Sequence, residues 1–105
     1  MEIKVNTDNN VEGKQSLETH VIETINSGIG RFDSHITRVE VHLSDENGNK
    51  KGPKDKRCLI ECRMKGAEPI AVTSQEDTLH NALNEAVDKM KAKLTTRIGR
   101  LKSVR

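Results

Sequence analysis

Four cationic side chains recur at helical spacing near the end of the chain. Lys89, Lys93, Arg97 and Arg100 follow one another at intervals of four, four and three residues. In a helix of 3.6 residues per turn, these intervals place all four on one side, about 100° from the neighbouring apolar stripe. A row of cations on a rigid element is suited to binding a polyanion such as RNA. We call these four residues the basic ridge.

The basic ridge could also have a purely structural explanation, which is compensation of the helix dipole. Cations near a helix C-terminus are stabilising by about 0.3–1 kcal/mol each, but this effect fades within about one turn. No acidic residue follows Asp88, and the basic run that begins at Lys89 covers about four turns. Dipole compensation therefore explains Arg100 better than Lys89. A solvated face without any partner stays open as the alternative to polyanion binding.

A second group of cations lies in the polar segment 44–56, which is predicted to be a long exposed loop. Its candidate RNA contacts are Lys50, Lys51 and Lys54. A basic loop and a basic helix could bracket separate backbone segments of a folded RNA, because phosphates supply most of the affinity. A solubilising hairpin tip is the alternative. Since Phe32 is the only aromatic residue, stacking on unpaired bases is disfavoured and structured RNA is favoured.

Side chains capable of catalysis or metal binding are present, but the sequence gives them no shared site. The histidines are scattered, at His20, His35, His42 and His80. Cys58 and Cys62 fall on the predicted core face of one strand, about 13 Å apart at about 3.3 Å per residue, which is too far for a disulfide. We interpret both thiols as small core residues of a reducing compartment. We predict no catalytic residue, no metal site, no cofactor and no small-molecule substrate.

Apolar periodicity predicts the elements that would position these residues. Strands are expected at about 1–6, 38–43, 57–64 and 69–73, and helices at about 13–29 and 79–101. Phe32 is expected to plug the end of the first helix, and Ser74 to Asp77 to supply caps for the second. The predicted fold class is α+β, in the order β-α-β-β-β-α, with an antiparallel four-stranded sheet and two helices packed on one face.

Length and composition favour one modest domain over residues 1–105. The chain is 32% hydrophobic and 32% charged, so its core must be small and aliphatic. The net charge of +2 says little about partners, and the distribution of charge matters more. No apolar run of about 18 residues and no leader-like start is present. We therefore expect a cytoplasmic monomer without a membrane segment.

Three segments of the sequence carry a family resemblance. They are 9–12, then 17–33 on to the strand around Val39 and Val41, and 77–94. With the β-α-β-β-β-α order, they resemble the ribosome hibernation promoting factor and ribosome-associated inhibitor A family, also called sigma-54 modulation proteins. Because the sequence stops at Arg105 without a further C-terminal domain, it is similar to the short forms of that family.

The resemblance implies a fold similar to the double-stranded RNA-binding domain and a site in the small ribosomal subunit, where messenger and transfer RNA would lie. It implies inhibition of translation by occupancy, in stationary phase or stress, with 16S rRNA as the partner and no enzymatic step. It also implies RNA-facing roles for Lys89, Arg97 and Arg100. Lys91 and Lys93 are added on local charge alone.

Two departures from the family pattern accompany the resemblance. Ala92 and Thr96 stand where many members carry further basic residues, and the loop 44–56 is longer and more polar than usual. Affinity or placement on the ribosome could therefore differ. A general structured-RNA-binding module and a protein-interaction regulator of a sigma-54 system are the alternative functions.

Overall fold

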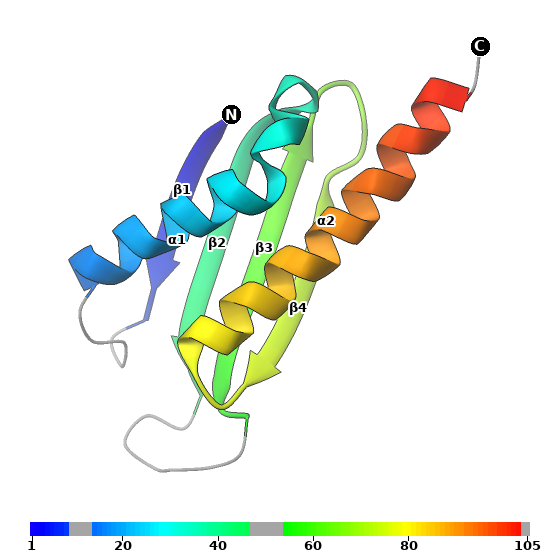
Figure 1. The fold of residues 1–105 in the computed structure, drawn as a ribbon. Coiled ribbons are helices and arrows are strands. Elements are labelled where there is room, and N and C mark those ends of the chain that lie inside the picture. The colour runs from blue at the N-terminus through cyan, green and yellow to red at the C-terminus, as the bar shows by residue number, and fades with distance from the viewer. Residues whose placement is uncertain (9–13, 47–53, 104–105) are drawn as a thin grey trace.

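Four strands form one sheet, and Figure 1 shows both α-helices crossing the same face of it. The computed structural model describes residues 1–8, 14–46 and 54–103. The elements are β1 (Glu2–Thr7), α1 (Lys14–Ile29), the 3-10 helix η1 (Gly30–His35), β2 (Ile36–Asp45), β3 (Lys56–Met64), β4 (Ile70–Glu76) and α2 (Leu79–Ser103). The predicted α+β class and the β-α-β-β-β-α order are confirmed.

The sheet is mixed, not antiparallel throughout. Its strand order is β1-β2-β3-β4, and the β2–β3 and β3–β4 pairs are antiparallel as expected, but β1 runs parallel to β2. The antiparallel expectation was wrong for β1 because α1 connects it to β2, and a helical crossover returns the chain in the same direction. The two edge strands of the sheet are consequently β1 and β4.

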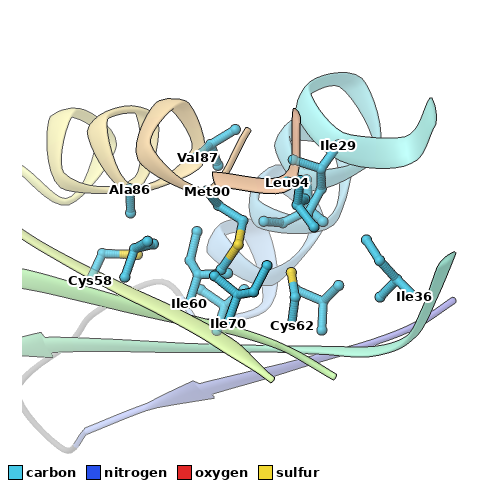
Figure 2. Close-up of a cluster of buried hydrophobic side chains, with 14 of the residues drawn as sticks. Ile29, Ile36, Cys58, Ile60, Cys62, Ile70, Ala86, Val87, Met90 and Leu94 are labelled. Atoms are coloured by element: carbon cyan, nitrogen blue, oxygen red, sulfur yellow. The ribbon is translucent and has the colours of Figure 1, made fainter. Parts of the chain in front are cut away.

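The core lies between the sheet and the two helices. Along β3, Cys58, Ile60 and Cys62 are fully buried, whereas the two residues between them are half-buried. Figure 2 shows Met90 and Leu94 of α2 facing these strand side chains. The alternation is that of a strand with one covered face, as the sequence predicts. Phe32 is also buried, in η1, so the expected plug at the end of α1 is confirmed.

Burial leaves the two cysteines chemically inert in the folded chain. Loss of hydration raises the pKa of both the Cys58 and the Cys62 thiols to about 12, and the Glu61 carboxylate adds to the effect at Cys62. Since the thiolate is the reactive form of cysteine, neither residue is suited to act as a nucleophile. Their place in the core agrees with the interpretation of both as small core residues.

The start of α2 differs from the sequence prediction. Ser74 belongs to β4, where its buried hydroxyl donates to the carbonyl oxygen of Ala82, so it does not cap the helix. The cap is Thr78, whose hydroxyl oxygen accepts the backbone N–H of Asn81 at 3.0 Å. The prediction erred because β4 continues three residues beyond the expected end at 73, to Glu76, and so includes three of the four residues assigned to the cap.

The close approach of α1 and α2 requires a glycine at position 28. A Cβ atom at Gly28 would overlap the Cγ1 methyl group of Val87 on α2, whereas a Cβ atom at Gly30 would meet nothing within 4 Å. The low helix propensity of glycine is enough to explain why α1 ends near Gly28 and Gly30. The contact with Val87 adds a steric reason for having glycine at position 28, and this reason does not apply at position 30.

We expect Gly28→Ala to destabilise the fold. Overpacking costs about 1–3 kcal/mol, which outweighs the gain of about 0.5–1 kcal/mol from replacing a helical glycine. Gly30→Ala is the matched control and should leave the free energy of unfolding unchanged or slightly higher. Urea denaturation followed by circular dichroism measures both, and equal stability of the two variants would contradict the contact with Val87.

Candidate nucleic-acid interface

The apolar stripe of α2 fixes the direction in which the basic ridge points. Leu83, Met90 and Leu94 are completely buried against the sheet, so residues offset by about 100° lie beside the core and not in it. Lys89, Lys93 and Arg100 are exposed and Arg97 is half-buried. The structure thus brings all four residues of the basic ridge to one side of α2, as the spacing predicts.

The basic ridge forms one wall of a groove whose other wall is the edge strand β4. One hollow of this groove is lined by Lys89, Lys93, Ala71, Val72, Thr73 and Ala92. The adjoining hollow is lined by Lys93, Arg97, Arg100, Pro69, Ile70, Ala71, Ala92 and Thr96. Because Lys93, Ala71 and Ala92 belong to both, the two hollows are continuous. We call this feature the β4–α2 groove.

Two cations of the basic ridge are already bound to backbone carbonyls on the β4 side of the groove. The Lys89 ammonium donates to the carbonyl oxygen of Thr73 at 2.9 Å, and the Arg97 guanidinium donates to that of Glu68 at 2.7 Å. Lys89 also forms an ion pair with Glu85 at 3.3 Å. Charged side chains laid along an edge strand hinder its pairing with another strand. Lys89 and Arg97 therefore have a structural role in addition to their charge.

Lys93 differs from these two cations. It is exposed, it lines both hollows, and within the described residues no hydrogen bond or ion pair engages its ammonium group. Lys91 is equally exposed but does not line the groove. Of the two residues that the sequence added on local charge, the structure brings only Lys93 into the groove.

Of the predicted loop cations, only Lys54 lies within the described residues, and it does not extend the basic ridge. Lys50 and Lys51 lie outside the described residues. Lys54 is exposed and adopts a positive φ of 55°, and its backbone N–H donates to the Asp77 carboxylate at 2.8 Å, just before α2 begins. Its charge therefore lies near the acidic start of α2, whereas the ridge runs toward the other end of the helix.

An acidic pair separates Lys54 from the basic ridge. A hydrogen bond with Glu85 raises the pKa of Glu76, and hydrogen bonds with Lys89 and Glu76 lower the pKa of Glu85. Lys54 acts electrostatically on both carboxyl groups, and Lys89 forms an ion pair with Glu85. Positive potential is consequently concentrated at the Lys93 to Arg100 end of the groove.

Sequence reasoning missed the second wall of the groove. Ala71 and Thr73 are small, exposed residues of an edge strand. In the sequence, only the shortness of the predicted strand 69–73 indicated that it lies at an edge of the sheet. Ala92 and Thr96, which the sequence marked as departures from a basic pattern, both line the groove. This part of the groove therefore has small side chains where further cations were expected.

Larger metal-binding clusters and membrane-spanning helices are absent from the described part of the chain. No group of three or more histidine, cysteine or carboxylate side chains is placed to hold a metal ion among these residues. Across the same residues, no helix is both long and apolar enough to cross a membrane.

Comparison with known proteins shows which family and which solved structures this chain resembles. The family model described as "Sigma 54 modulation protein / S30EA ribosomal protein" matches residues 3–102. The search of curated protein sequences found no match. Among solved structures, the Protein Y N-terminal domain of Thermus thermophilus is similar with a TM-score of 0.71 and 20% identity, over 91% of this chain and 98% of that one.

A ribosomal subunit interface protein of Coxiella burnetii is also similar, with a TM-score of 0.64 and 14% identity, over 94% of this chain and 99% of that one. At these identities, the two structures show a shared fold. The family model, in contrast, extends over nearly all of the sequence. The chain therefore belongs to the sigma 54 modulation protein / S30EA ribosomal protein family, which is a family of binding proteins and not of enzymes.

Proposed function

We propose that this chain is a ribosome hibernation factor that binds the small ribosomal subunit through the β4–α2 groove. In this proposal, it contacts 16S rRNA in the channel for messenger and transfer RNA and inhibits translation by occupancy, in stationary phase or under stress. It acts in the cytoplasm and is a monomer when free. Membership of the family supports association with ribosomes, and one of the two similar structures is a ribosomal subunit interface protein.

The observation that carries the proposal is the line of cations along the β4–α2 groove. Lys93, Arg97 and Arg100 line one hollow together with the small side chains of Ala71 and Ala92. Small residues allow a phosphate backbone to approach, and the cations supply the attraction. No aromatic residue lines the groove, so bases have nothing to stack on. This composition favours recognition of the backbone of a folded RNA over recognition of base sequence.

The proposal predicts that the chain travels with ribosomes. Lysate from stationary-phase cells, sedimented through a sucrose gradient at low salt, should contain the protein in the 30S and 70S fractions. Raising the salt should release it, because its contacts are to phosphates. A protein that stays at the top of the gradient yet binds purified RNA duplexes would instead be a general structured-RNA-binding module. One that binds neither would point to a regulator of other proteins.

A charge reversal at Lys93 tests the groove directly. Lys93→Glu should weaken binding to 30S subunits several-fold and reduce the slope of log K against log[salt] by about 1, because one cation no longer neutralises a phosphate. Lys4→Glu is the matched control, because Lys4 is also exposed but lies on β1 at the opposite edge of the sheet. Filter-binding titrations at several salt concentrations measure both, and similar weakening in the two variants would remove the groove from the proposal.

The structural role of Lys89 and Arg97 predicts a second, separable effect. Lys89→Ala and Arg97→Ala should each lower the melting temperature slightly as well as weaken ribosome binding, since each removes a charge-assisted hydrogen bond to an exposed backbone carbonyl. Lys93→Ala should weaken binding at an unchanged melting temperature. Thermal melts beside the binding titrations resolve the two effects, and a destabilised Lys93→Ala would refute this division of roles.

A further inference from the structure

Two histidines that are 60 positions apart in sequence meet between the helices, outside the β4–α2 groove. His20 lies on α1 and His80 lies in the first turn of α2. The Nε2 atom of His20 is 3.1 Å from the Nδ1 atom of His80. Their ring centroids are 5.2 Å apart, and the ring planes are inclined by 27°. Neither side chain has a part in the proposed binding of RNA.

We propose that His20 and His80 form a two-histidine site for one divalent transition-metal ion such as Zn²⁺, which would join α1 to α2. Imidazole nitrogens bind zinc at about 2.0–2.1 Å. Two nitrogens separated by 3.1 Å can both lie at that distance from one ion, with an N–Zn–N angle of about 100°, close to the tetrahedral value of about 109°. The two nitrogens now face each other across this contact, so both rings must turn for their lone pairs to converge on one ion.

A third side chain is placed to orient the His80 ring. The Nδ2 atom of Asn84, one helical turn after His80, lies 3.0 Å from His80 Nε2 in the structure. An amide can present its oxygen or its nitrogen by a half-turn about its last bond. With the oxygen toward the ring, Nε2 carries the proton and donates it to Asn84, and the Nδ1 lone pair is left facing His20. Metal-binding histidines are commonly held in this way by a hydrogen bond from the other ring nitrogen.

The surroundings of the pair are compatible with a bound cation. His80 is exposed and His20 is partly exposed, so water can reach the ion and complete its coordination shell. No lysine or arginine lies within four residues of either histidine in the sequence, whereas Glu23, Glu76 and Asp77 do. Lys54, whose backbone N–H donates to Asp77, brings one positive charge to the same end of α2, so the neighbouring carboxylates outnumber the cations. The buried thiols of Cys58 and Cys62, whose pKa values are raised by loss of hydration, do not compete for the ion in the folded chain.

A bound ion would shift the equilibrium between the folded and unfolded states toward the folded state. The two histidines come together only when α1 and α2 are packed, so the ion binds the folded state in preference to the unfolded one. The proposal does not depend on ribosome binding, because the pair contributes no side chain to the β4–α2 groove.

Titration of the full chain with Zn²⁺ alone tests the site. Isothermal titration calorimetry should give one ion per chain, and the melting temperature should rise with the Zn²⁺ concentration. His20→Ala and His80→Ala should each abolish both effects. His42→Ala is the matched control, since His42 is exposed on β2 and outside the pair, and it should bind as the parent does. The absence of saturable binding to the parent chain would overturn the proposal.

A measurement on the unaltered chain keeps the proposal falsifiable if a histidine variant fails to fold. Long-range ¹H–¹⁵N spectra of the imidazole rings should show Zn²⁺ shifting the ring nitrogens of His20 and His80, with those of His35 and His42 unchanged. Shifts confined to His35 or His42 would place the ion elsewhere and refute the site. Ribosome binding measured on the same sample, with and without Zn²⁺, should be the same.

Discussion

The placement of the candidate interface depends on the burial of one apolar stripe of α2 against β3 and β4. Leu83, Met90 and Leu94 are completely buried there, and burying each such side chain is worth about 1.5–3 kcal/mol. Rotating α2 by one residue, about 100°, would expose this stripe and turn the basic ridge away from β4. The orientation of the ridge is therefore as stable as the core itself.

Separation of charge along α2 gives a nearly neutral chain a strongly basic surface. The net charge is only +2, yet the acidic residues that balance the cations are gathered elsewhere. Glu76 and Glu85 neutralise the Lys54 and Lys89 end of the groove. Beyond Asp88, the sequence of α2 contains basic residues and no acidic ones. An incoming polyanion would therefore be attracted mainly to one end of the groove.

Most elements could be predicted from the sequence, because each obeys a local rule. Alternation on β3 and the stripe on α2 are periodic signals, and the side of α2 that carries the basic ridge follows from the same periodicity. The direction of β1 and the exact end of β4 were mispredicted, since strand pairing depends on partners far away in the sequence. Glycine at position 28 could be read as a helix end, but its contact with Val87 depends on how two helices cross.

In the candidate sites, too, the features marked by a local pattern were predicted, and those that depend on contacts between distant residues were not. The cationic wall of the β4–α2 groove was predicted, whereas its wall on β4 was not, because nothing local marks Ala71 or Thr73 as the neighbours of Lys93. The sequence presents His20 and His80 only as scattered residues. A separation of 60 positions conceals a distance of 3.1 Å between two ring nitrogens. Pairs of this kind come from the topology and not from any motif.

The carbonyl contacts of Lys89 and Arg97 have a consequence for how firmly a ligand can be held. Each cation gives one N–H group to a backbone oxygen, at 2.9 or 2.7 Å, and keeps its other donors for a second acceptor. A phosphate can therefore bind the remaining N–H groups while the contact with the carbonyl persists. Because the carbonyl already restricts the rotamers of each side chain, binding an anion costs less conformational entropy. The two cations are thus partly preorganised before any ligand arrives.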